Sequence, residues 1–397
     1  METKFINPKF SKNYKGTFAL TGAYAVTEAM RQIEPDVVAA YPITPQTPIV
    51  EKFSQYVADG KVATEMILVE SEHSAMSAVV GASVAGARAM TATSSVGLAL
   101  MFEVVNAASG LRLPIVMPVV NRALSAPINI HCDHSDTMAC RDSGWIQIYS
   151  ESAQEAYENT ILAIRLSEHP EVMLPSMVCQ DGFITSHSVE VVNVLNDDVV
   201  KRFIGEYHPK ESLLFSKKPI TIGALQLTDS FFETKRQQVQ GMENFFKVYP
   251  AIANELASIT GNNYPFVEPY ALEDAQCAIV AINSSAGTIR SVVKKLRMKG
   301  LKVGMLKIKL FRPFPYEDVA KALETVPKVA VLDRALSFGA NAPLFSEIKN
   351  AVPQNALFSY VYGLGGRELL ESHIEGLFKD LLSSKEIIGQ NYLGLKE

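Results

Sequence analysis

Apolar runs that alternate with segments of helical length constrain the fold of this 397-residue chain more than any other feature. Runs with the length and apolar content of short strands stand at 17–21, 37–41, 67–69, 89–93 and 115–121. Strands separated by helices need crossover connections, which place successive strands parallel to one another in one sheet. The N-terminal two-thirds of the sequence therefore predicts a doubly wound, parallel α/β domain.

A second set of strands and helices begins after residue 265. Its expected strands lie at 277–283, 302–308, 329–333 and 358–362. Residues 190–265 mix charged and aromatic side chains with little clear period, and we interpret them as an excursion and linker. The pattern predicts two domains, 1–250 with this excursion at its C-terminal end, and 266–397.

Charge and hydropathy exclude several classes of function. The net charge is −5 and no long basic run is present, which argues against nucleic acid or an anionic membrane as the main partner. The opening residues have no apolar core, so we expect no secretory signal. The most apolar region, 92–120, is interrupted by Glu103, Asn106 and Arg112 and is not expected to span a membrane. We expect a cytoplasmic protein.

The cysteines argue against a metal cluster on this chain. Four are present, at 132, 140, 179 and 277, and none forms a CxxC pair, so we expect neither a disulfide framework nor an iron–sulfur cluster. The run His-Cys-Asp-His at 131–134 could be read as a metal site, but it lacks the ligand spacing of a zinc site. We expect no bound metal here.

A proline-rich stretch, YPITPQTP at 41–48, follows the second predicted strand. Each proline disfavours helical backbone in the residue before it, which predicts that Tyr41, Thr44 and Thr47 are extended. Thr44 would then present its hydroxyl at the carboxyl end of a strand, where open α/β sheets bind ligands. The alternative is a rigid turn that carries no chemistry.

Two more polar residues follow predicted strands. Glu72 begins a helix of small residues, 71–87, which we expect to be buried because small side chains allow close packing. Arg122 ends the strand 115–121, and its planar guanidinium is suited to binding a carboxylate. Taken singly, Glu72 could serve the helix dipole and Arg122 a structural ion pair. Together with Thr44 they predict a site at one edge of the sheet.

Seven motifs, in order, resemble one family. They are YPITPQTP, the Ser-Glu before the small-residue helix, TATSSVGLALM, NRALSAPINIHCDHSD, CQDGFITSH, KLFRPFP and YGLGGRE. The set resembles the alpha subunits of 2-oxoacid:ferredoxin oxidoreductases, in the pyruvate-using branch, over nearly the whole chain. The resemblance implies a pyrimidine-type thiamine diphosphate-binding domain followed by a domain similar to the transketolase C-terminal domain.

The resemblance also implies roles for individual residues. It places Glu72 at the aminopyrimidine nitrogen of thiamine diphosphate, Thr44 in contact with the substrate, and Arg122 at the carboxylate of the oxoacid. It implies further cofactor contacts from Ile43, Ser95 and Gly97. For Ser95 and Gly97, simple capping of the next helix is an equal alternative.

The implied reaction is oxidative decarboxylation of pyruvate with coenzyme A to acetyl-CoA and carbon dioxide. Its electrons pass through [4Fe-4S] clusters to ferredoxin. No GDG…N motif for a magnesium-bound diphosphate is present, because Asp181-Gly182-Phe183 lacks the following Asn. We therefore expect beta, gamma and delta type partner subunits to supply Mg²⁺, the diphosphate site and the clusters.

Some alternatives stay open. A single arginine suits pyruvate, but the substrate could be another 2-oxoacid. The chain could also be a non-catalytic scaffold with a thiamine-type domain, whereas the missing diphosphate motif argues against a free-standing transketolase-like enzyme. The turn Gly363-Leu364-Gly365-Gly366-Arg367 could cradle a phosphate, but it does not match GxGxxG and is expected to be a tight turn. For the second domain we expect a role in subunit packing, with a contribution to coenzyme A binding left open.

Overall fold

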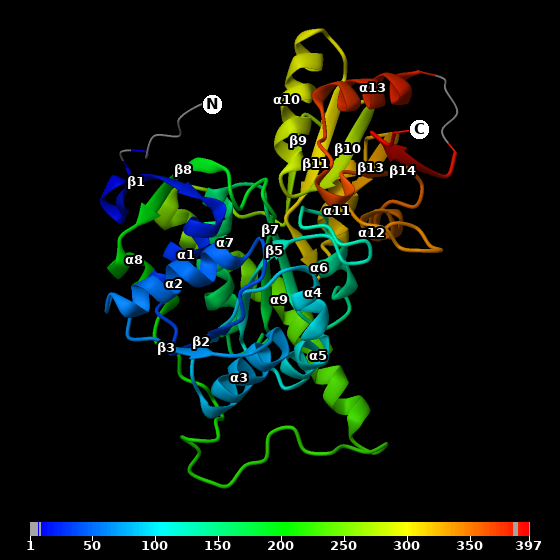
Figure 1. Ribbon diagram of the computed structural model, residues 1–397. Coiled ribbons are helices and arrows are strands. Elements are labelled where there is room, and N and C mark those ends of the chain that lie inside the picture. The colour runs from blue at the N-terminus through cyan, green and yellow to red at the C-terminus, as the bar shows by residue number, and fades with distance from the viewer. Residues whose placement is uncertain (1–6, 8, 384–387, 397) are drawn as a thin grey trace.

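The computed structural model describes residues 7, 9–383 and 388–396, and these form two α/β units that lie side by side (Figure 1). The N-terminal sheet has the order β12 (Leu310–Arg312), β6 (Ile146–Ser150), β7 (Ser176–Asp181), β5 (Val116–Asn121), β4 (Ala89–Met90), β2 (Val37–Ala40), β3 (Glu65–Leu68). Of these strands, β12 alone runs antiparallel to its neighbour. The predicted doubly wound α/β fold is confirmed.

The C-terminal sheet repeats this design. Its order is β15 (Gln390–Leu393), β14 (Ala356–Tyr362), β13 (Lys328–Asp333), β10 (Cys277–Ile282), β11 (Val303–Ile308), β9 (Val267–Tyr270). All neighbours are parallel except β9 and β11. Helices α10 (Ser285–Met298) and α13 (Glu371–Leu382) cover one face, and α11 (Tyr316–Leu323) and α12 (Pro343–Ala351) cover the other.

Helices cover both faces of the N-terminal sheet because side chains alternate along each strand. On β5, Val116 and Val120 pack with α1 (Gly22–Ile33), α2 (Thr47–Ala58), α7 (Ala153–Ser167) and α9 (Phe231–Thr260). Met117 and Val119 pack on the other face with α3 (Glu72–Ala85), α4 (Ser95–Leu100) and α5 (Phe102–Gly110). This second core continues into the C-terminal unit through residues such as Val280. The two units therefore share apolar packing.

The first predicted strand does not join the parallel sheet. β1 (Tyr14–Thr21) pairs antiparallel with β8 (Val189–Leu195) in a separate two-stranded sheet. Much of β1 is exposed, including Phe18. A strand inside a parallel sheet is buried on both faces, which β1 is not.

Residues 190–265 hold more structure than a linker. They contain the end of β8, α8 (Asp197–Ile204) and the 30-residue α9, and irregular chain is confined mainly to 205–230. Phe245, Tyr249 and Leu256 of α9 are buried in the first core. No described helix, α9 included, is long and apolar enough to cross a membrane.

Three local expectations differ from the structure. The small-residue helix α3 is buried along one side only, and Ser77 and Gly81 are exposed. Thr47 is not extended but begins α2, because Pro48 occupies the start of the helix, where its missing N–H has no intrahelical acceptor. The polar stretch after Arg122, which gave no clear pattern, contains α6 (Ser135–Ala139) and is followed by β6.

Candidate active site

Neighbouring strands of the N-terminal sheet end at one edge, and a polar residue follows or closes each of them. In sheet order these residues are Asp181 at the end of β7, Arg122 after β5, Ser95 after β4, Thr44 after β2 and Glu72 after β3. The five strands are parallel, so their carboxyl ends share this edge, which faces the C-terminal unit on the β7 and β5 side (Figure 1). Ligands of open α/β sheets bind along such an edge.

Glu72 is the first residue of α3 and is only 7% exposed. Its neighbour Ser71 caps the helix by accepting a hydrogen bond from the backbone N–H of Ser74. No donor in the described part of the chain hydrogen-bonds the Glu72 carboxylate. A largely buried carboxylate without a donor from the chain is free to accept a hydrogen bond from water or from a bound ligand.

Gly97, on α4, leaves the space in which this carboxylate lies. A methyl group on Gly97 would come within 2.6 Å of Glu72 Oε1 and 2.7 Å of Thr93 Oγ1. The Thr93 hydroxyl is itself buried without a hydrogen-bond partner among the described residues. The Glu72 carboxylate and the unsatisfied Thr93 hydroxyl therefore both border a position where even a methyl group would not fit.

Arg122 and Thr44, two of the predicted site residues, are in direct contact. Nη1 of Arg122 donates to the Thr44 carbonyl at 2.8 Å, and Nε donates to the Asn129 carbonyl at 2.9 Å. Among the described residues Nη2 meets no acceptor. Burial lowers the pKa of Arg122, opposed by the charge of Asp136, and an arginine remains cationic at neutral pH. The guanidinium is thus fixed on two sides and keeps one nitrogen for a ligand.

The other two predicted cofactor contacts have different settings. Ser95 is fully buried, and its hydroxyl donates to the Ala123 carbonyl, so its side chain holds the chain after β5. Ile43 is partly buried, and its carbonyl accepts the backbone N–H groups of Gln46 and Thr47, which shapes the turn that carries Thr44. Both residues fix the backbone of the site.

Asp136 ties two strand ends together. Its Oδ2 accepts the backbone N–H groups of Ser95 and Arg122, both at 3.0 Å, and its Oδ1 accepts the side-chain amide of Asn121 at 2.9 Å. Burial raises the pKa of Asp136 to about 6, although these hydrogen bonds oppose the shift. One buried carboxylate therefore fixes Ser95 and Arg122 relative to each other.

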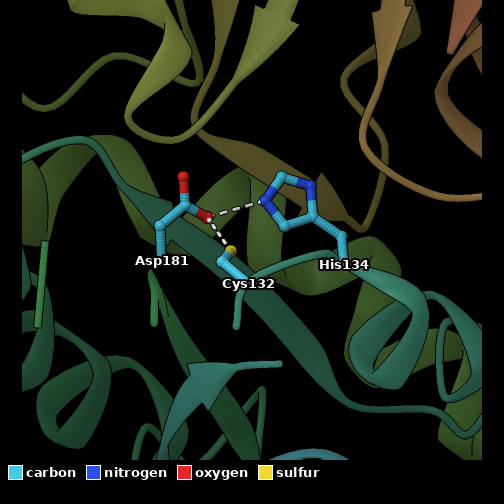
Figure 2. Close-up of side chains that lie close together, drawn as sticks. All are labelled: Cys132, His134 and Asp181. Carbon is cyan, nitrogen blue, oxygen red and sulfur yellow. Dashed lines mark hydrogen bonds and ion pairs between the residues drawn. The ribbon is translucent and has the colours of Figure 1, made fainter. Parts of the chain in front are cut away.

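Cys132, His134 and Asp181 form a second buried group next to this edge (Figure 2). The thiol lies 3.3 Å and His134 Nε2 lies 2.7 Å from the same oxygen, Oδ1 of Asp181. The other oxygen accepts Arg334 Nη1 at 2.8 Å and the Ser284 backbone N–H.

This group has the residue types of a metal site but the charges of an ion-pair cluster. Burial would raise the pKa of Asp181, but Arg334 and His134 hold it well below its ordinary value. Both carboxylate oxygens are occupied by donors, and the guanidinium repels a cation. Because Ser284 and Arg334 follow strands of the C-terminal sheet, Asp181 joins the two units.

The site residues that were not singled out from the sequence include Thr93, Asn129, Asp136 and Arg334. Thr93 lies in the TATSS run two residues before Ser95, and its position after a predicted strand was an available signal. Asn129 and Asp136 lie in a polar stretch without periodicity, and their one signal was their place in the motif NRALSAPINIHCDHSD. Their importance arises from contacts that the chain makes only when folded.

Comparisons with known proteins agree over most of the chain. Residues 28–253 match the family model of the pyruvate flavodoxin/ferredoxin oxidoreductase thiamine diphosphate-binding domain, and residues 275–374 match pyruvate:ferredoxin oxidoreductase core domain II. The pyruvate synthase subunit PorA of Thermotoga maritima is 60% identical over 384 residues, which cover 96% of this chain and 98% of that protein. The ketoisovalerate oxidoreductase subunit VorA of Pyrococcus abyssi is 40% identical over 91% of this chain and 92% of its own length.

Two solved structures share the fold. A 2-oxoglutarate:ferredoxin oxidoreductase from Magnetococcus marinus aligns with a TM-score of 0.74 and 20% identity, over 93% of this chain and 66% of that longer chain. A split-gene transketolase aligns with a TM-score of 0.57 and 12% identity, over 92% of this chain and 99% of that chain. At such identities the alignments concern the fold alone.

Proposed function

Because this chain belongs to the pyruvate flavodoxin/ferredoxin oxidoreductase family, we propose that it provides the thiamine-binding half of an active site that oxidatively decarboxylates pyruvate. The chain is an alpha-type subunit of a thiamine diphosphate-dependent oxidoreductase. The observation that carries the proposed site is the buried Glu72 carboxylate, which accepts no hydrogen bond from the described chain and which lies in the space that Gly97 leaves open.

Glu72 is proposed to hold a proton at the aminopyrimidine nitrogen of the cofactor. When bound, thiamine diphosphate supplies the carbon nucleophile and the electron sink for decarboxylation of a 2-oxoacid. A carboxyl group that shares a proton with a ring nitrogen acts as a general acid–base group. The absence of a side chain at Gly97 leaves the space in which this carboxylate lies, near the Thr93 hydroxyl, and so sets the position from which it would meet the ring.

Arg122 and Thr44 are proposed to hold the oxoacid. The Arg122 guanidinium has one nitrogen available and is oriented by the Thr44 and Asn129 carbonyls. Thr44 is exposed and neutral, so the pair offers a single positive charge, which suits a monocarboxylate such as pyruvate. Ile43 and Ser95 would shape the cofactor pocket through the backbone that they hold.

A partner subunit is proposed to complete the cofactor site. β3 is the edge strand of the N-terminal sheet, and its last residue, Leu68, is 85% exposed beside a hollow of about 460 Å³ that Tyr41 and Pro42 also line. We propose that a beta type subunit covers this edge and brings the Mg²⁺-bound diphosphate site. Gamma and delta type subunits would carry the [4Fe-4S] clusters that reduce ferredoxin, in a cytoplasmic complex.

We also propose the division into residues 1–250 and 266–397; α9 is the last helix before the second domain and continues past residue 250 to Thr260. The two family models also match on either side of residues 254–274. We propose as well that the second domain packs against partner subunits and that it could contribute contacts to coenzyme A.

One relative favours a second substrate. The VorA protein of Pyrococcus abyssi is named for ketoisovalerate and matches this chain at 40% identity, as does the PorA protein of Pyrococcus furiosus. The 60% identity to the Thermotoga PorA protein is the reason for placing pyruvate first. A branched oxoacid is the alternative.

The test is to purify the assembled enzyme anaerobically and to measure viologen reduction that depends on coenzyme A and on pyruvate or 2-ketoisovalerate. Glu72→Gln is expected to lower kcat by about 100-fold or more, since general acid–base groups contribute on that scale. Glu65→Gln, at the opposite end of β3, is the matched control and should retain activity. A preference for 2-ketoisovalerate would show that the substrate is the branched oxoacid and not pyruvate. A complex that assembles without thiamine diphosphate and without activity would show that the chain is a non-catalytic scaffold.

A further inference from the structure

We propose that the C-terminal unit sets the position of Arg122 through Asn129, which makes Asn129 a positioning residue for substrate binding. This inference rests on the proposed role of Arg122 in holding the oxoacid carboxylate. Three features carry it: the acceptor of Arg122 Nε, the anchoring of Asn129, and the glycine turn against which Asn129 packs.

The first feature is the acceptor that orients the guanidinium. Arg122 Nε donates to the backbone carbonyl of Asn129, seven positions further along the chain, at 2.9 Å. The second acceptor, the Thr44 carbonyl, lies in the turn between β2 and α2. The direction of the guanidinium therefore depends on where the loop places Asn129.

The second feature is the anchoring of this loop. Within residues 125–130, Asn129 alone is partly buried, and the other five are exposed. Its side-chain amide donates to the carbonyl of Gly365 at 3.1 Å, and its side-chain oxygen accepts the backbone N–H of His131 at 2.7 Å. Asn129 thus connects an otherwise exposed loop to the C-terminal unit.

The third feature is the turn that receives Asn129. Gly365 and Gly366 have φ values of +60° and +81°, which favour glycine. A methyl group on Gly365 would lie 2.4 Å from the Asn129 amide nitrogen, and one on Gly366 would lie 2.4 Å from Cβ of His131. The Gly366 N–H donates to the Cys132 carbonyl at 2.7 Å. The tight turn expected from the sequence is therefore used to hold the loop.

The turn is itself fixed to the N-terminal sheet. Its first residue, Gly363, packs against Arg334, whose Nη1 is bound to Asp181. The contacts through which the C-terminal unit holds the N-terminal unit therefore include Asp181 at the end of β7 and Asn129 in the loop after β5. A shift of the C-terminal unit would move the acceptor of Arg122.

The main test is Asn129→Ala in the assembled enzyme. Arg122 keeps its Thr44 contact but loses a fixed second acceptor, so KM for pyruvate should rise about tenfold while kcat stays within about twofold, a typical effect of losing an outer hydrogen-bond partner. Asn129→Asp should have the same effect, because it keeps an acceptor for His131 but loses the donor to Gly365. Asn355→Ala is the control, because it also removes a side-chain amide that donates to backbone carbonyls, those of Leu323 and Val326.

A double-mutant cycle separates positioning from a general structural role. In an Arg122→Ala background, Asn129→Ala should cause no further rise in KM, because residues that act through one group are not additive. Gly365→Ala should reproduce the KM effect. Gly300→Ala should not, because Gly300 has a φ of +82° but nothing within 4 Å of an added methyl group.

Different results would contradict the role of Arg122 and the role of Asn129. If Arg122→Ala leaves KM unchanged, the proposed role of Arg122 is refuted. If Arg122→Ala raises KM but Asn129→Ala, Asn129→Asp and Gly365→Ala do not, Arg122 binds the oxoacid and the positioning role of Asn129 is overturned. Additive effects of Asn129→Ala and Arg122→Ala would also overturn it.

Discussion

At the scale of single residues, the position of Glu72 depends on a neighbour that has no side chain. Gly97 lies within α4 and does not have a positive φ, so its backbone would accept alanine. An alanine side chain would instead overlap with Glu72, because its methyl group would lie 2.8 Å from Cγ and 2.6 Å from Oε1 of that residue. The carboxylate would have to rotate away, since the site is closely packed.

Gly97→Ala is therefore expected to weaken thiamine diphosphate binding to the assembled enzyme by about 10- to 100-fold, as expected for a displacement near 1 Å in a preorganised site. Isothermal titration of the cofactor-free enzyme measures this change. Gly376→Ala on α13, where an added methyl group meets nothing within 4 Å, is the control and should leave binding unchanged. Equal affinities for Gly97→Ala and the wild type would show that Glu72 is not set by this contact.

The residues found from the sequence share one property. Thr44, Glu72 and Arg122 each follow an apolar run, so strand ends made them candidates, and the family resemblance then implied their roles. Thr93 has the same position, but its unsatisfied hydroxyl is evident only once α4 packs on α3. Asn129 acts through an acceptor 236 positions away, Gly365, a pairing that sequence periodicity does not encode.

At the scale of elements, helices and strands with a strong apolar period were predictable, and α9 was the largest omission. Its buried residues Phe245, Tyr249, Ile252 and Leu256 recur at helical spacing. Exposed charges between them and Pro250 inside the helix hid this stripe. The placement of β1 outside the main sheet also depends on its pairing with β8, in which Thr21 pairs with Val189, 168 positions further along the chain. Such pairings are set by tertiary packing.

The junction of α7 with the chain after α9 contains a buried carboxylate with a strongly shifted pKa. Glu158 on α7 is 3% exposed and accepts hydrogen bonds from Gln154 and Asn262. Burial raises its pKa from 4.5 to about 7, although these hydrogen bonds oppose the shift. The folded state therefore binds this proton more tightly than the unfolded state between pH 4.5 and about 7, and stability falls as pH rises through that window.

Glu158→Gln should remove this loss because glutamine keeps an oxygen for Asn262 and carries no charge. We expect the variant to be more stable than the wild type at pH 8 by about 2 kcal/mol and similar at pH 5. Urea unfolding of the purified chain at both pH values measures the difference. Glu206→Gln, with a side chain 89% exposed, should change neither value. A variant less stable than the wild type at pH 8 would mean that the ionised carboxylate stabilises this junction.

At the scale of the whole molecule, the two units are joined by strand β12, by a shared apolar core and by the Asp181 cluster. β12 belongs to the chain of the C-terminal unit but pairs with β6 of the N-terminal sheet. Asp181 is fully buried and binds Arg334, which is 3% exposed. Because desolvation offsets the attraction within a buried ion pair, the pair is better understood as fixing the relation of the units than as a large source of stability.

Arg334→Ala tests this view. It leaves the Asp181 carboxylate buried without its cation and should cost about 3–5 kcal/mol, measured by urea unfolding of the purified chain at pH 7. The double variant with Asp181→Asn and Arg334→Met removes both charges and should recover most of this loss. Arg202→Ala, which breaks an exposed pair with Asp198 on α8, should cost less than about 0.5 kcal/mol. If the double variant is as unstable as Arg334→Ala, packing around Arg334 and not the unpaired carboxylate controls the junction of the two units.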